Sequence, residues 1–187
     1  MNSGQHAASQ PPGILRRFFN LLAWVGFVGL MSWLMFAYVG HAYAVPSGSM
    51  EGTIMTGDRV FGEKVSYYLR DPEPGDIVMF QDPEIPGRLL LKRCIAVGGQ
   101  TVDINGEDGL VYVDGRPLDE PYTAGQPTYR LDEGVDYPYT VPEGCMWMMG
   151  DNRGNSQDSR YFGAVPASTA EARSLFVLWP LDDIGLL

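Results

Sequence analysis

Histidine is almost absent from this chain, which has only His6 and His41 among its 187 residues. His6 lies in a polar N-terminal stretch and His41 ends a long apolar run, so neither is well placed to serve a folded domain that begins near Pro46. A serine hydroxyl is a poor nucleophile near neutral pH and needs a proton acceptor within hydrogen-bond reach. The scarcity of histidine therefore argues against a Ser-His-Asp triad.

Lysine is equally scarce, since Lys64 and Lys92 are the only two in the chain. A lysine can replace histidine as the base when desolvation and neighbouring cations favour its neutral amine. Lys92 has both features, because it follows the apolar run 89–91 and precedes Arg93. The ordinary alternative for any lysine is a solvated surface charge. With so few lysines, Lys92 is the main candidate for a base.

Cysteine is also rare, with only Cys94 and Cys145. Two cysteines and two distant histidines cannot form a metal site of the usual spacing, so we expect no metal. The pair Gly98-Gly99 lacks the strand, loop and helix context of a phosphate-binding loop, and no cofactor is implied. Cys94 beside Lys92-Arg93 could be a reactive thiolate, and the two cysteines could form a disulfide. We expect both to be packing residues.

No acidic residue precedes Glu51, so the charge of the chain is divided sharply. All 23 Asp and Glu lie downstream, against 11 of the 13 Lys and Arg, which leaves that part with a net charge of −12. Such a domain is repelled by nucleic acid and by anionic lipid headgroups, so we expect no nucleic-acid partner.

A single long apolar segment lies near the N-terminus and carries no charge from Phe18 to Val45. Its core, 21–39, would span about 28 Å of hydrocarbon as a helix. Arg16 and Arg17 precede it, so the positive-inside rule places the N-terminus in the cytoplasm. We predict a disordered tail at 1–17, a single-pass plasma-membrane anchor at 18–44 and an extracytoplasmic domain at 45–187. A secretory signal cleaved after Ala42-Tyr43-Ala44 is the alternative, although its apolar run is typically only about 7–15 residues.

Short apolar runs separated by Gly, Pro and Asp turns follow the anchor and are typical of strands. One short helix is predicted at 167–173, with Ser168 as its cap. The fold class is therefore mainly β, an antiparallel sheet domain with one N-terminal transmembrane helix and a hairpin-and-loop insertion at 105–144. The predicted strands are 59–61, 76–80, 89–97, 101–104, 110–113, 145–149 and 175–179.

Four motifs follow the apolar segment in order: 46–54 (PSGSMEGTI), 57–60 (GDRV), 92–93 (KR) and 150–163 (GDNRGNSQDSRYFG). This series resembles the conserved boxes of bacterial type I signal peptidases, and the match runs from the anchor to about residue 166. The family usually has proline where Gly52 stands and Pro-Gly-Asp where this chain has Gly98-Gly99-Gln100. Both places are predicted turns, in which glycine adopts unusual backbone angles.

The residue types and the resemblance together assign roles to the motifs. Ser49 is the expected nucleophile, and Lys92, as the neutral amine, would take and return its proton. The backbone N–H of Ser49 would stabilise the oxyanion. The resemblance implies a second donor in the Ser47 hydroxyl, and a serine, Ser156, that holds the lysine amine.

Two ion pairs are expected to fix the motif loop structurally, Asp158 with Arg160 and Asp151 with Arg93. An extended peptide would add to a sheet edge while its small side chains at −1 and −3 enter shallow apolar pockets. Ordinary core packing is the alternative for each residue expected to line these pockets, which are Val45, Pro46, Met50, Leu90 and Leu91.

The resemblance implies cleavage of signal peptides from secretory preproteins after an Ala-x-Ala site. It also implies the lipid bilayer as surroundings and the Sec translocon as a candidate partner. Two alternatives remain: a protease of the same family with one dedicated client, and an inactive membrane-anchored β domain that binds peptides. The presence of both Ser49 and Lys92 argues against the inactive form.

Overall fold

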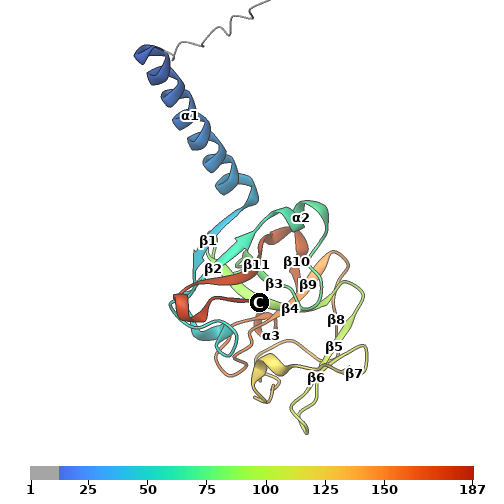
Figure 1. The fold of residues 1–187 in the computed structure, drawn as a ribbon. Coiled ribbons are helices and arrows are strands. Elements are labelled where there is room, and N and C mark those ends of the chain that lie inside the picture. Colours follow the sequence, from blue (N-terminus) through green and yellow to red (C-terminus); the bar gives the residue numbers. More distant parts are fainter. Residues whose placement is uncertain (1–12) are drawn as a thin grey trace, which may run out of the picture. The chain divides into compact units, whose positions relative to one another are not determined.

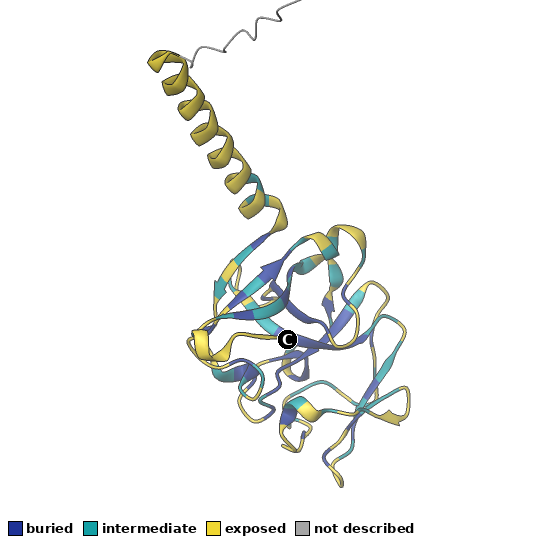
Figure 2. Cartoon of the chain, in the orientation of Figure 1, coloured by how far each residue is buried: buried dark blue, intermediate teal, exposed yellow. Residues whose placement is uncertain are grey.

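The computed structural model describes residues 13–187, which divide into a helical unit ending at Tyr38 and a β unit from Val39 to Leu187. The helical unit consists of α1 (Ile14–Leu34) and a π-helical turn (Met35–Val39) whose last residue already belongs to the β unit. Ile14–Val39 is long and apolar enough to cross a membrane, with a mean hydropathy of 1.8, and none of α1 is buried (Figures 1 and 2). Of the tail predicted at 1–17, residues 1–12 lie outside the described residues. Residues 14–17 form the start of α1.

An eight-stranded antiparallel sheet forms the centre of the β unit, in the order β1-β2-β11-β3-β4-β9-β10, with β12 paired to β11 (Figure 1). Its strands are β1 (Gly40–Ala44), β2 (Arg59–Glu63), β3 (Ile77–Gln81), β4 (Leu89–Val97), β9 (Cys145–Met149), β10 (Val165–Pro166), β11 (Ala170–Trp179) and β12 (Gly185–Leu186). Two short helices accompany them, α2 (Val65–Leu69) and α3 (Ser159–Phe162).

A second, four-stranded antiparallel sheet has the order β7-β6-β5-β8. Its strands are β5 (Thr101–Ile104), β6 (Val111–Val113), β7 (Arg116–Pro117) and β8 (Tyr139–Thr140). Three of them, β6, β7 and β8, lie within residues 105–144, the segment predicted as an insertion. The mainly β fold class with few helices is confirmed.

Most predicted strands are confirmed, and 89–97, 101–104 and 145–149 match at both ends. The helix predicted at 167–173 is wrong, because only Ala167–Thr169 forms a 3-10 turn and β11 begins at Ala170. The run Ala170-Glu171-Ala172-Arg173 favours a helix locally, but β11 pairs with β2 and β3 on its two sides, and tertiary pairing overrides a weak local preference.

The start of the β unit also differs from the predicted boundary. Residues 40–44, which the predicted anchor at 18–44 includes, form β1 and pair antiparallel with β2 from Gly40↔Glu63 to Ala44↔Arg59. The two predicted glycine turns are confirmed, since Gly52 has φ +107° and Gly99 has φ +83°, values that residues with a side chain rarely adopt.

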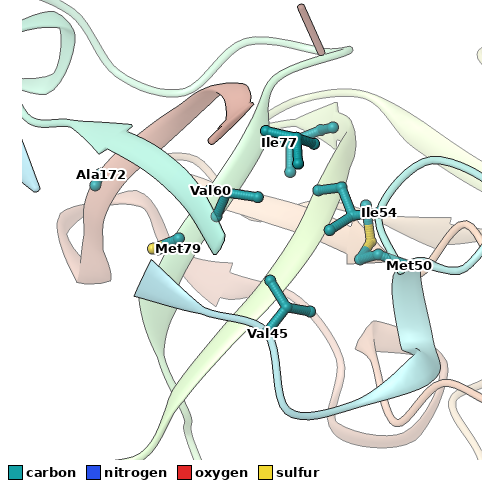
Figure 3. Close-up of a cluster of buried hydrophobic side chains, with 8 residues drawn as sticks. Val45, Met50, Ile54, Val60, Ile77, Met79 and Ala172 are labelled. Atoms are coloured by element: carbon teal, nitrogen blue, oxygen red, sulfur yellow. The ribbon is translucent and has the colours of Figure 1, made fainter. Parts of the chain in front are cut away.

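Three buried apolar clusters hold the β unit together. The first joins the segment around Met50 to the large sheet, and Figure 3 shows Met50 and Ile54 beside each other within it. The second packs strands of the small sheet against Trp147 and Met149 of β9, and the third lies around Val78 and Met148. Met50, Ile54 and Trp147 are all fully buried, so the residues beside them in sequence have fixed positions.

Candidate active site

Ser49 lies in a single 3-10 turn, Gly48–Met50, that directly follows the chain's exit from β1. The neighbouring Met50 is fully buried, and its carbonyl accepts hydrogen bonds from the N–H groups of Thr53 and Ile54. The apolar side chain of Met50 thus anchors the turn in the first cluster. Ser49 itself is only 6% exposed.

Lys92 lies in the middle of β4, which pairs with β3 on one side and β9 on the other. Its Nζ lies 2.6 Å from Ser49 Oγ and 3.1 Å from the carbonyl oxygen of Leu91. The side chain comes from a strand held on both sides, so its amine has little freedom to move away. The structure therefore brings the two residues predicted as nucleophile and base into direct hydrogen-bond contact.

Burial lowers the pKa of Lys92 from 10.5 to about 8, because only 3% of the residue is exposed and a buried charge loses its hydration. The carboxylates of Asp158 and Asp151 act in the opposite direction, while the cation of Arg88 lowers the pKa further. An amine with this pKa is partly neutral at mildly alkaline pH. Lys92 can then accept a proton from the hydroxyl it contacts.

The two supporting serines differ in their surroundings. Ser47 is exposed, and its Oγ lies 3.4 Å from Ser49 Oγ, within reach of a group attacked by Ser49. Ser156 is buried, and its Oγ has no hydrogen-bond partner within residues 13–187. Within the described residues, the predicted hydrogen bond between Ser156 and the amine of Lys92 is therefore not formed.

Arg93 and Asp151 form a buried bidentate pair, with Nε–Oδ1 at 2.9 Å and Nη2–Oδ2 at 2.7 Å. The hydroxyl of Thr53 donates to the same carboxylate at 2.6 Å. Asp151 thus joins three segments: the strand that carries Lys92, the loop after Ser49 and the motif at 150–163.

Asp158 and Arg160 form the other expected pair, at 2.9 and 3.0 Å, and both are buried. Asp158 also accepts from the backbone N–H of Gly150 at 3.0 Å, while Arg160 donates to the carbonyl of Arg153. These bonds close the loop between β9 and α3 into a compact unit next to the nucleophile turn.

A groove runs beside the two reactive groups. Its walls include all five residues predicted to line it, and of these Val45 and Met50 also belong to the first apolar cluster. Sequence reasoning missed four further wall residues: Tyr43, Ala44, Met79 and Leu89. The signal for Tyr43 and Ala44 was obscured because they were assigned to the anchor. His41 is not a wall residue and its ring packs in a tilted arrangement against Tyr43, while His6 lies outside the described residues.

Sequence reasoning also missed a set of contacts between the small-sheet region and the charged residues near the dyad, which we call the Glu120 brace. Arg153 is buried and donates to the carbonyl of Gly150, the hydroxyl of Thr128 and both oxygens of Glu120. The ring of Tyr122 covers the guanidinium of Arg93, with 4.0 Å from Cζ to the ring centroid. Glu120 and Tyr122 lie in a loop whose spacing carries no recognisable motif, so no sequence signal could have found them.

The cysteines are both free thiols, so the disulfide alternative is wrong. Burial raises the pKa of Cys94 to about 12, which leaves it protonated and unreactive at neutral pH. Both pack in apolar clusters, as expected. Within the described residues, no group of His, Cys, Asp or Glu side chains could hold a metal ion.

Comparisons with known proteins show which family the chain resembles. Residues 18–179 match the family model described as signal peptidase, peptidase S26. A probable signal peptidase I-1 of Synechocystis sp. is 38% identical, over 84% of this chain and 81% of that protein. Signal peptidase I of Mycobacterium tuberculosis is 32% identical, over 91% and 75%. A crystal structure of a signal peptidase I from Enterococcus faecalis is 33% identical and covers 56% of this chain and 97% of that one, with a TM-score of 0.46.

The signal peptidase family model and the relatives named signal peptidase I identify the class of the protein as a serine endopeptidase, a hydrolase. The chain belongs to the signal peptidase family, peptidase S26. Membership in that family and the apolar helix at Ile14–Val39 together indicate a membrane-anchored protein.

Proposed function

We propose that this protein is a membrane-bound endopeptidase that removes N-terminal signal peptides from secretory preproteins, using Ser49 as nucleophile and Lys92 as base. The 2.6 Å contact between Lys92 Nζ and Ser49 Oγ, at a buried position on the groove wall, carries this proposal. The pKa of Lys92 at about 8 supports it, because the amine can exist in its neutral form under mild conditions.

The reaction would proceed by acyl transfer. Ser49 Oγ bonds to the carbonyl carbon of the −1 residue while its proton passes to Lys92 Nζ. The oxyanion accepts from the Ser49 N–H and the Ser47 hydroxyl. The C–N bond then breaks, Lys92 returns the proton to the leaving amine, and water activated by Lys92 releases the signal peptide from Ser49.

Specificity would come from the groove. Its walls are mainly apolar and include Val45, Leu90 and Leu91. An extended peptide pairing along such a groove would place alternate side chains, those at −1 and −3, against the same wall. Shallow apolar pockets at these two positions would select small residues, as an Ala-x-Ala site requires.

The topology proposed with this function places residues 1–17 in the cytoplasm, the anchor within 18–39 and the catalytic domain, which begins with β1, outside. Arg16 and Arg17 precede the apolar segment and support this orientation. The bilayer would be the surroundings of the anchor, and the Sec translocon would deliver substrates.

The test uses the detergent-solubilised full chain with a secretory precursor that has alanine at −3 and −1, and mass spectrometry to locate the cut. We expect cleavage after the −1 alanine by the wild type, with loss of about 10²–10⁴-fold or more in Ser49→Ala and Lys92→Ala. Lys64→Ala, at the only other lysine, is the matched control and should keep its activity. Cleavage by Lys92→Ala at the wild-type rate would refute the dyad, and no cleavage by the wild type would favour a dedicated client or an inactive peptide-binding domain.

A further inference from the structure

Asn152 makes two hydrogen bonds to the turn that carries Ser49, and no role assigned so far explains them. Its side-chain Nδ2 donates to the carbonyl oxygen of Gly48 at 3.0 Å, and its backbone N–H donates to the carbonyl oxygen of Ser49 at 3.1 Å. Two consecutive peptide units on either side of the Ser49 Cα are therefore tied to a single residue that lies 103 positions later in the chain.

The first of these bonds helps to fix the direction of the Ser49 N–H, together with the Glu51 N–H, which donates to the same Gly48 carbonyl at 3.2 Å. In a trans peptide the C=O and the next N–H lie in one plane and point in opposite directions. Gly48 C=O and Ser49 N–H belong to the same peptide unit, so a bond that holds the carbonyl toward Asn152 holds the N–H away from it. That N–H is the backbone donor to the oxyanion in the proposed mechanism.

The orientation of the Asn152 amide is determined by its neighbours. Gly48 O is an acceptor, and the Glu51 carboxylate, whose Oε2 lies 3.5 Å from Nδ2, is a second acceptor. Glu51 is itself held by the Thr56 hydroxyl at 2.8 Å. Only the NH₂ end of the amide can donate to both acceptors, so the flipped orientation would place three oxygens together.

We infer that Asn152 is a positioning residue that orients the Ser49 N–H toward the oxyanion formed during peptide cleavage. This inference rests on the proposed function. Asn152 touches neither the substrate nor the reacting atoms, and it acts through the Gly48–Ser49 peptide. Its contact is separate from the pair formed by Lys92 and Ser49 Oγ, so loss of the amide should reduce transition-state stabilisation and leave the base unchanged.

The experiment compares wild type, Asn152→Ala and Asn152→Asp in the full-length, detergent-solubilised protein. Direct loss of one oxyanion donor costs about 10²–10³-fold in kcat, and an indirect effect should be smaller, so we expect kcat to fall about 10- to 100-fold. KM should change less than about twofold, and the pH midpoint of the rate should stay where it is in the wild type. Asn152→Asp keeps the size of the side chain but cannot donate, so it should lose at least as much.

A second measurement is the inhibition constant of a peptide aldehyde ending in Ala-x-Ala. A purely structural role of Asn152 would not change this constant. Ser49 Oγ adds to its carbonyl carbon, the serine proton passes to Lys92, and the resulting tetrahedral adduct places its oxygen where the oxyanion forms. The inhibition constant of the aldehyde should rise by about the same factor as kcat falls, because both depend on the oxyanion donors. Binding of the alcohol with the same sequence, which forms no adduct, should be unchanged.

Asn155→Ala is the matched control. Asn155 is an exposed asparagine three residues along in the same loop, and its backbone N–H bond to Asn152 O survives the substitution. It should keep kcat within about twofold of the wild type, and melting temperatures would show that every variant is folded.

The outcomes separate the two proposals. Wild-type kcat in Asn152→Asp would overturn the inference. A fall in kcat in the uncharged Asn152→Ala would also overturn it if the affinity for the aldehyde were unchanged or if the pH midpoint shifted. An inactive wild type would overturn the proposed function instead.

Discussion

The two sheets of the β unit contribute to the site in different ways. The large sheet supplies Lys92 from a strand paired on both sides, and the turn that carries Ser49 is anchored in its apolar cluster. The small sheet supplies no reacting group, yet the loop between β7 and β8 sends Glu120 to Arg153 and Tyr122 to Arg93. The large sheet therefore carries the two groups of the proposed dyad, and the small sheet contacts the charged loop beside them.

Lys92 and Arg93 are neighbours in β4, and their different contacts show how these supporting interactions affect the site. Arg93 is buried with a bidentate carboxylate partner and an aromatic ring over its guanidinium. Lys92 is buried as deeply, but its Nζ contacts the hydroxyl of Ser49 and a backbone carbonyl. A paired cation remains charged, whereas one without a carboxylate contact tends to lose its proton. Because Asp151 pairs with Arg93, the amine of Lys92 has no carboxylate in hydrogen-bond contact, as its proposed role as a base requires.

The largest effect should come from removing the carboxylate brace. Glu120→Ala leaves the buried guanidinium of Arg153 without its anionic partner, and breaking a buried pair in this way costs about 3–5 kcal/mol. We expect a clear fall in the melting temperature of the detergent-solubilised protein. Glu120→Gln keeps an acceptor of the same shape and should lose less. An unchanged melting temperature in Glu120→Ala would show that the small sheet does not support the site.

The pH dependence of cleavage tests only the contribution of the large sheet, which carries Lys92. Because the neutral amine is the active form and the pKa of Lys92 is about 8, kcat/KM should rise about tenfold per pH unit up to about pH 8 and then level off. That amounts to about fiftyfold between pH 6 and pH 8, where half of the amine is neutral, and about a hundredfold from pH 6 to the plateau. Arg88→Gln removes a cation that lowers this pKa, so its profile should shift to higher pH. A flat profile across this range would count against Lys92 as the base.

The stability of the protein should depend on the same proton. The pKa of Lys92 is lower in the folded than in the unfolded chain, so the unfolded state binds more protons between about pH 8 and 10.5. The contribution of Lys92 to stability is therefore unfavourable below pH 8 and is relieved as the pH rises through that window.

The smallest effect should come from the aromatic contact. Tyr122→Leu removes the ring over Arg93, a contact worth about 1 kcal/mol, and should lower stability by that amount with less than about fivefold loss of activity. Tyr122→Phe keeps the ring and loses only the hydroxyl bond to Glu120, so it separates the two contributions. A fall as large as that in Glu120→Ala would mean that Tyr122 does more than cover the guanidinium.

Much of the fold followed from local patterns. Strands such as 89–97 and 145–149 were predictable because short apolar runs end at Gly, Pro and Asp turns. The helix predicted at 167–173 failed because the preference of four residues for a helix is small beside pairing with two neighbouring strands. Residues 40–44 were assigned to the anchor because they are apolar and continue its run, and composition alone does not show where a helix ends.

The sequence by itself determined the candidates for the chemistry, because so few residues could serve. With histidine and lysine almost absent, Ser49 and Lys92 stood out, and the motif at 150–163 marked the loop beside them. Only the tertiary structure decided which groups meet. Four features depend on residues that lie far apart in the chain. They are the 2.6 Å contact between Lys92 Nζ and Ser49 Oγ, the burial that lowers the pKa of Lys92, the ion pair of Glu120 with Arg153 and the hydrogen bond from Asn152 to Gly48. Contacts of this kind depend on how sheets pack in three dimensions, and no local pattern specifies them.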